Sequence, residues 1–336
     1  MNRKKAAAIT AGLVTAMLAG YFGDVQAYID TVNWKTETAS QPVFFMQSED
    51  PVKDDALMSR IRQEAEGLRI EPIDAVVDRV WKAIPGYSGR EVDVEETYRR
   101  ITEGGTAPYS ADKPIPFVFR EIKPKVSLND LEAQPIYRGN KAKPMAALMI
   151  NVAWGNEYLP SILNTLDEEK VKATFFLDGS WLSKNVELAK EIQRRGHQLE
   201  NHAYSHPNMS QVSSERARLE ITKTKKLLSE KLGVTNRWFA PPSGDFDART
   251  VKIAAEEGLK TVLWTVDTVD WRNPSPDSVI AKISKQAEAG SLILMHPTAS
   301  TQGSIKGIIR VLKSKGYTVG TVEETLSENR VTDAGS

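Results

Sequence analysis

Few residues in this chain can carry chemistry. Its 336 residues include four histidines and no cysteine, which excludes a disulfide framework, a thiolate zinc cluster and a cysteine nucleophile. Two of the histidines, His202 and His206, lie four residues apart in the segment NHAYSH. In a turn after a strand, two such imidazoles can point at one metal ion, and a catalytic zinc site adds a third protein ligand. A lone histidine is more often structural, but this pair is a candidate metal site.

Other polar and aromatic residues stand where short apolar runs end. Five such positions carry distinctive residues: 151–155 (NVAWG), 201–207 (NHAYSHP), 238–244 (WFAPPSG), 267–271 (DTVDW) and 296–297 (HP). If the apolar runs are parallel strands, their carboxyl ends meet at one edge of a sheet, where α/β proteins place their chemistry. The sequence therefore predicts one site assembled from all five segments.

The elements that must position this site follow a regular pattern. Residues 145–152 (MAALMINV) form a continuous apolar run of strand length, which is typical of a strand buried on both faces. Runs of this kind alternate with stretches of helical periodicity, several of which end at a glycine. This alternation predicts a parallel sheet wrapped by helices over residues 144–328.

The preceding region, residues 28–143, has a different composition. It is interrupted by prolines and charges and contains no histidine. Helical patterns are expected near residues 54–67, 74–83 and 94–101, and a strand is expected within 114–124. Residues 138–144 (RGNKAKP) have the composition of a linker. We expect a small α+β accessory domain followed by the linker, and a short tail at residues 329–336.

The first 27 residues have the features of an export signal. Residues 2–5 are basic, residues 6–22 carry no charge, and small residues occupy positions 25 and 27. The alternative is an uncleaved anchor helix, for which 17 apolar residues are at the short end. We expect an exported protein of the cell envelope or the extracellular space. Its only expected membrane contact is through this segment if it is not cleaved.

Overall composition excludes some partners and permits a folded core. The 44 basic and 44 acidic residues balance, so the cationic excess of nucleic-acid-binding proteins is missing. Hydrophobic residues make up 40% of the chain, which is enough to bury a core.

The five strand-end segments resemble the conserved motifs of the NodB-homology polysaccharide deacetylases, carbohydrate esterase family 4. The family's His-Ser/Thr-x-x-His motif supplies two metal ligands and corresponds to His202 and His206. Its Leu-x-His motif supplies the general acid and corresponds to His296. Its Asp-x-x-Asp-Trp motif corresponds to Asp267, Asp270 and Trp271, and we count both aspartates as candidate catalytic residues. The resemblance covers residues 145–328 and implies a distorted (β/α) barrel of about seven parallel strands.

Three departures from the family pattern bear on function. The family reads Thr-Phe-Asp-Asp-Gly where this chain has residues 151–155, so Ala153 replaces the general base and Trp154 replaces the metal-binding aspartate. Ala240 replaces the arginine that orients the base. Losing a general base alone costs roughly 10²–10⁴ in rate. Two neutral imidazoles should hold zinc or another divalent cation weakly or not at all, unless Glu157, or less plausibly Asp178, substitutes as the third ligand.

Three hypotheses follow. The first is a deacetylase-fold protein that binds an N-acetylated cell-wall glycan, peptidoglycan or a chitin-like oligosaccharide, and hydrolyses it poorly. Its expected sugar-contacting residues are Trp154, Tyr204, Pro242 and Trp271. The second is an active metal-dependent N-deacetylase with a rebuilt site, and the third is a structural protein of the envelope.

Overall fold

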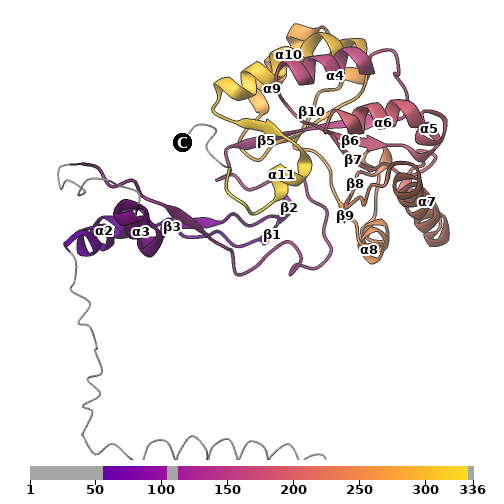
Figure 1. The fold of residues 1–336 in the computed structure, drawn as a ribbon. Coiled ribbons are helices and arrows are strands. Elements are labelled where there is room, and N and C mark those ends of the chain that lie inside the picture. Colours follow the sequence, from indigo (N-terminus) through magenta and orange to yellow (C-terminus); the bar gives the residue numbers. More distant parts are fainter. Residues whose placement is uncertain (1–55, 104–112, 332–336) are drawn as a thin grey trace, which may run out of the picture. The chain divides into compact units, whose positions relative to one another are not determined.

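The computed structural model describes residues 56–103 and 113–331. A parallel sheet in the order β10-β11-β5-β6-β7-β8-β9 dominates it, with β12 also paired to β5 (Figure 1). Its strands are β5 (Met145–Val152), β6 (Thr174–Leu177), β7 (Gln198–Asn201), β8 (Trp238–Phe239), β9 (Lys260–Thr261), β10 (Val266–Asp267), β11 (Leu292–Met295) and β12 (Thr318–Gly320). The predicted α/β fold class, a distorted barrel of about seven parallel strands wrapped by helices, is confirmed.

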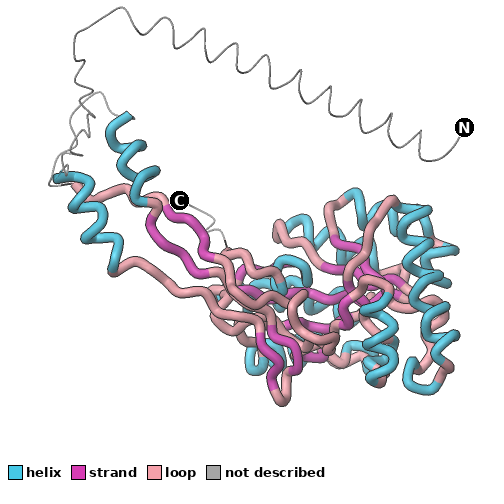
Figure 2. Tube along the Cα trace, turned by 90° about the horizontal axis from the view of Figure 1, so that it is seen from below, coloured by secondary structure: helices cyan, strands magenta, loops and turns pink. Residues whose placement is uncertain are grey.

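Helices cover this sheet, as the cyan segments around the magenta strands show (Figure 2). Side chains of Ser213, Asp247 and Thr298 accept N–H groups at the first turns of three of them, which satisfies donors that a helix start leaves unpaired. The helices are α4 (Leu159–Glu168), α5 (Gly179–Lys184), α6 (Val186–Arg194), α7 (Ser214–Leu232), α8 (Ala248–Glu256), α9 (Pro276–Gln286), α10 (Ala299–Ser314) and α11 (Val322–Leu326).

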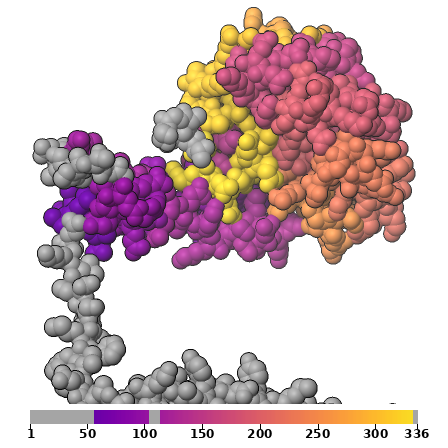
Figure 3. Space-filling view, viewed as in Figure 1, coloured from indigo at the N-terminus to yellow at the C-terminus, as the bar shows by residue number. Residues whose placement is uncertain are grey.

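The central strand joins the beginning and the end of the domain. β5 pairs with β11 on one side, and with β6 and β12 on the other. Residues early and late in the domain, magenta and yellow, therefore meet on the surface (Figure 3).

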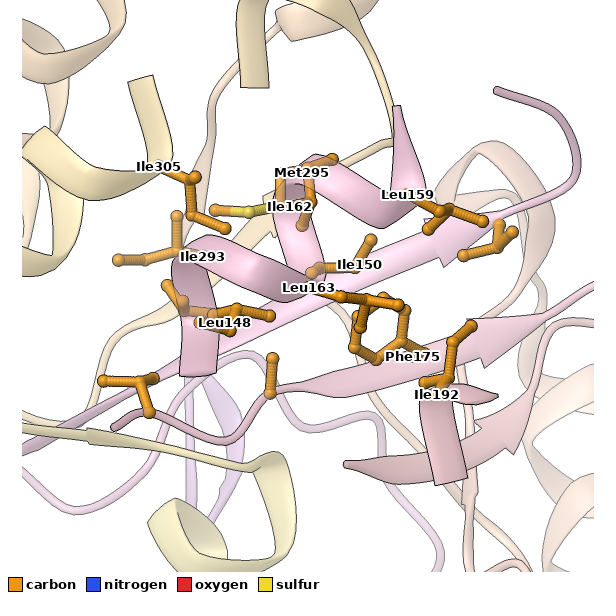
Figure 4. Close-up of a cluster of buried hydrophobic side chains, with 14 of the residues drawn as sticks. Leu148, Ile150, Leu159, Ile162, Leu163, Phe175, Ile192, Ile293, Met295 and Ile305 are labelled. Carbon is orange, nitrogen blue, oxygen red and sulfur yellow. The ribbon is translucent and has the colours of Figure 1, made fainter. Parts of the chain in front are cut away.

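The main core lies between the sheet and helices α4, α9 and α10. All eight residues of β5 are buried, as expected for a strand covered on both faces. Leu148 and Ile150 pack with α4 residues Leu159, Ile162 and Leu163 (Figure 4). This packing holds the end of β5 in place, and Ala153 and Trp154 follow directly after it.

The accessory region contains two helices and two antiparallel ribbons. The helix predicted at residues 74–83 is wrong, because β1 and β2 form a hairpin there. Valines favour a strand, and the Asp78 carboxylate accepts the N–H groups of Val80 and Trp81 and so stabilises the turn. The elements are α2 (Ala56–Glu66), β1 (Val76–Asp78), β2 (Lys82–Ile84), β3 (Gly89–Val92), α3 (Val94–Glu103) and β4 (Phe119–Ile122).

The accessory region and the sheet domain belong to one compact unit, residues 56–336. Arg138, in the predicted linker, is buried and donates to the Ala289 carbonyl at 2.9 Å. Ser88 N–H donates to the Glu328 carbonyl at 2.8 Å. The boundary near residue 143 stays a prediction. The signal or anchor segment lies outside the described residues, and within the described ranges no helix is long and apolar enough to span a bilayer.

Candidate active-site cleft

The register of the sheet brings the strand-end segments together. Val152 pairs with Leu177, Leu177 with Asn201, and Asn201 with Phe239. On the other side of β5, Ile150 pairs with Met295. The residues that follow these strands therefore share one edge of the sheet, and they include Ala153, Asp178, His202, Ala240 and His296.

A cleft of about 440 Å³ lies at this edge of the sheet, and Ala153, His202 and His296 are on its lining. The structure places all three sequence-predicted histidines on its lining, together with both positions of the altered first motif. The lining residues are Asn151, Ala153, Trp154, His202, His206, Ser243, Trp264, Asp267, Trp271, Leu294 and His296.

His202 is held by the backbone of a neighbouring strand. Its side chain is buried, and Nδ1 lies 2.7 Å from the Ala240 carbonyl oxygen. A carbonyl can only accept, so Nδ1 carries the proton and Nε2 remains available as a ligand atom. Burial lowers the pKa of His202 to about 3, with a further contribution from His206. The ring is therefore neutral at physiological pH, the form that binds metals.

His206 completes the pair from an exposed turn. The two ring centroids are 5.2 Å apart and the rings are nearly perpendicular. Ala203 and His206 both have left-handed backbone conformations, with φ of 58° and 57°. A sharply folded turn, and not one face of a helix, therefore brings His202 and His206 together.

His296 is fixed by a buried carboxylate. Its Nδ1 lies 2.8 Å from Asp270 Oδ1, and Asp270 Oδ2 accepts from the Thr301 hydroxyl and from the His296 backbone N–H. Asp270 is buried and its hydrogen bonds hold the imidazole in one orientation. Asp270 is thus a positioning residue, whereas Asp267 reaches the cleft itself.

The three substituted positions are occupied by side chains that cannot replace the lost functions. The Trp154 indole lies parallel to the His296 ring, with centroids 6.0 Å apart, and is 46% exposed. Ala240 is completely buried and belongs to a hydrophobic cluster with Trp238. Its carbonyl oxygen accepts a hydrogen bond from His202, but its methyl group could not orient a base at position 153 as an arginine would.

Some predicted contacts lie elsewhere. Tyr204 and Pro242 are not on the cleft lining. The Tyr204 ring is instead covered by Lys223, whose Nζ lies 3.4 Å from the ring centroid. Asn151 and Ser243 were not named individually as site residues, although both lie in segments that the sequence predicted to form the site. The signal for Asn151 was its place as the first residue of the altered motif.

The residues present do not complete a metal site. Glu157 is exposed and not on the cleft lining. Asp178 caps helix α5 through Oδ1, and its buried Oδ2 has no hydrogen-bond partner, but it too is absent from the lining. In the described part of the chain, no three His, Asp or Glu side chains are arranged to hold one ion. His202 and His206 therefore lack the third ligand of catalytic zinc sites.

Comparison with known proteins agrees with the geometry. Residues 138–262 match the family described as polysaccharide deacetylase. The chain is 35% identical over 185 residues to a peptidoglycan-N-acetylglucosamine deacetylase of Bacillus cereus, covering 54% of this chain and 67% of that protein. It therefore belongs to the polysaccharide deacetylase family, carbohydrate esterase family 4.

Two relatives extend over most of the chain. The uncharacterized protein YlxY of Bacillus subtilis is 43% identical over 277 residues, which is 82% of this chain and 85% of that protein. The crystal structure of BA3943 from Bacillus anthracis, described as a CE4 family pseudoenzyme, is 42% identical with a TM-score of 0.74. It covers 82% of this chain and 96% of that one. A BA3943 mutant is described as having restored enzymatic activity.

Proposed function

We propose that this protein binds a cell-wall glycan of amino sugars, with peptidoglycan as the expected polymer, and hydrolyses it poorly or not at all. The observation that carries the proposal is the end of β5. Ala153 and Trp154 stand on the cleft beside three histidines, where the family needs a base and a metal-binding carboxylate. The site keeps the frame of a deacetylase without two of its acting groups.

The remaining groups account for only part of deacetylation. His296, oriented by Asp270, can hold and transfer a proton at Nε2. Ala153 cannot take the proton from an attacking water, and the two remaining imidazoles lack an anionic partner. A divalent ion, when bound in an active family member, activates that water and polarises the carbonyl. Without a base at position 153 and a complete set of metal ligands, the cleft can still bind and orient a substrate.

The cleft walls support binding of a sugar. Trp154, Trp264 and Trp271 line it, and indole faces pack against the apolar faces of sugar rings. Its volume falls within the roughly 300–1,000 Å³ usual for small-ligand pockets. The relatives named as peptidoglycan deacetylases support a cell-wall glycan, and the predicted N-terminal signal supports export to the envelope.

Two assays on the full chain test the proposal. Acetate release from acetylated peptidoglycan and chito-oligosaccharides, with zinc or cobalt added, should stay near background. Sedimentation with purified peptidoglycan should retain the protein, and Trp154→Ala with Trp271→Ala should weaken retention more than Leu219→Ala, an exposed residue of α7 far from the cleft lining. Family-like turnover that disappears in His296→Ala would support the active-enzyme hypothesis. No release and no retention would leave the structural hypothesis.

A further inference from the structure

The cleft has an unusual balance of charge for a site that would hold an acetylated sugar. Among the described residues on its lining there is no lysine and no arginine, and Asp267 is the one carboxylate. The arginine of the family's third motif is here the buried Ala240. The lining therefore carries a formal negative charge and no fixed positive charge.

Several polar atoms of the lining are available to accept hydrogen bonds. His202 uses its Nδ1 proton on the Ala240 carbonyl, so its Nε2 has a lone pair. Asp267 Oδ1 accepts the Val269 N–H at 2.8 Å, and no described residue hydrogen-bonds to Oδ2. Asn151 and Ser243 can donate or accept. A ligand with several donors, such as an ammonium group, can therefore use these acceptor atoms.

The aromatic walls favour the same kind of ligand. Trp154 and Trp271 are about half exposed, and Trp264 joins them on the lining. Indole faces attract cations within about 6 Å of the ring centroid. Arg272 lies 4.7 Å from the Trp271 centroid, so one cation already contacts this ring, and Trp154 and Trp264 are the indoles without such a partner among the described residues. The lining thus combines indoles with one carboxylate oxygen that has no described hydrogen-bond partner, a composition that suits an ammonium group.

An N-acetyl group would be less well served. Its carbonyl oxygen needs a donor or a metal ion, because a buried carbonyl that is left unpaired weakens binding. In active family members a metal steadies this oxygen, whereas the described lining here offers side-chain donors such as Asn151, Ser243 and the indole N–H groups, with no lysine or arginine among them. A free amine brings up to three donors and a positive charge.

Building on the proposed glycan binding, we propose that the cleft recognises the free ammonium group of a de-N-acetylated amino sugar in preference to the N-acetylated residue. Asp267 Oδ2 accepts from the ammonium group, and Trp154 with Trp264 and Trp271 enclose it. The protein would thus bind the product of the reaction that its family catalyses. This differs from the N-acetylated ligand expected from the family resemblance alone.

The test compares two oligosaccharides of equal length on the full-length protein, with EDTA present to exclude metal-mediated binding. Isothermal titration with a glucosamine tetramer and with an N-acetylglucosamine tetramer should show binding at least about tenfold tighter for the free amine, the size expected for a charge-assisted hydrogen bond. Asp267→Asn should remove most of that preference. The variant keeps an oxygen for the Val269 N–H, so the turn is preserved.

Asp277→Asn is the matched control, because this carboxylate is exposed in the first turn of α9 and is not on the cleft lining. It should bind both tetramers as wild type does. Equal binding of the two tetramers by wild type, or tighter binding of the N-acetylated one, would overturn the inference and leave glycan binding standing. No binding of either tetramer would refute the inference and count against the proposed function as well. If Asp267→Asn fails to fold, competition by glucosamine against N-acetylglucosamine on wild type decides the same question.

Discussion

Three substitutions should rebuild deacetylase chemistry in this cleft: Trp154→Asp, Ala153→Asp and Ala240→Arg. Trp154→Asp returns an anionic group to the edge of the sheet that holds His202 and His206, and removes an indole that stacks on His296. We expect this change alone to raise zinc affinity, because it gives the pair of imidazoles a third protein ligand. The lost stacking costs about 0.5–1.5 kcal/mol, which the fold can tolerate since the indole is 46% exposed.

The other two substitutions depend on the first. Ala153→Asp supplies a base worth roughly 10²–10⁴ in rate, but it has no activated water to act on until a metal is bound. Ala240→Arg replaces a completely buried methyl group in a packed cluster. Overpacking there costs about 1–3 kcal/mol, and a buried guanidinium without a partner adds to that cost. The single Ala240→Arg variant should therefore unfold at lower temperature, and Ala153→Asp should recover part of the loss by pairing with it.

The assay is acetate release per enzyme from an N-acetylated chito-oligosaccharide, with bound zinc and thermal unfolding measured on the same samples. Groups that act as a unit are strongly non-additive, so the triple variant should exceed the sum of the single variants. An inert triple variant with full zinc occupancy would refute the reasoning, because the missing groups would then not be what limits the chemistry. Wild-type turnover at family-like rates would refute it equally.

Three further predictions concern zinc retention, the buried carboxyl group of Glu200 and the backbone at Gly155. Purified wild type should lose zinc on dialysis, as measured by metal analysis, and zinc that survives a chelator wash would reveal a replacement ligand. Burial raises the pKa of Glu200 to about 8, so this side chain is protonated in the folded state and ionised in the unfolded state between about pH 4.5 and 8. The free energy of unfolding should fall with rising pH across that window, by up to about 1.4 kcal/mol per pH unit from this group, and urea titrations of Glu200→Gln should show a flatter profile. Gly155 has φ of 82°, and a Cβ there would lie 2.1 Å from the Pro297 carbonyl oxygen. Gly155→Ala should therefore destabilise by at least about 1 kcal/mol in thermal unfolding, and an unchanged melting temperature would show that the loop can move.

The arrangement of the sheet domain could be predicted because its signals are local and repeated. Apolar runs of strand length alternate with helical stretches, and the polar residues stand where the runs end, so the edge that carries the site follows from the topology of parallel sheets. The accessory region could not be predicted as well. The β3–β4 ribbon depends on pairing between distant segments. For the local β1–β2 hairpin, the sequence around residues 74–83 fits a helix as readily as a hairpin.

The site was partly predictable for a related reason. The spacing of His202 and His206 and the position of His296 identify ligand and acid candidates, but which side of a loop faces the cleft depends on backbone conformation. Ser243, whose φ is 54°, is on the lining, while its neighbour Pro242 is buried and is not on the lining. The Tyr204 ring contacts Lys223 and does not reach the lining, and no sequence pattern indicates that contact.

The site residues that match the family pattern and those that depart from it differ in how much the fold depends on them. Asp270 accepts hydrogen bonds from the His296 backbone N–H and from the Thr301 hydroxyl as well as from the imidazole. It therefore ties the end of β11 and the start of α10 to the segment after β10, and the fold needs it whether or not a reaction takes place. His202 likewise connects the end of β7 to the Ala240 carbonyl after β8. Among the described residues the side chains of Ala153 and Trp154 make no comparable hydrogen bonds, although Trp154 stacks on His296, so the fold does not depend on these two side chains in the same way. The change at these two positions is thus stronger evidence about chemistry than the persistence of the Asp270–His296 pair.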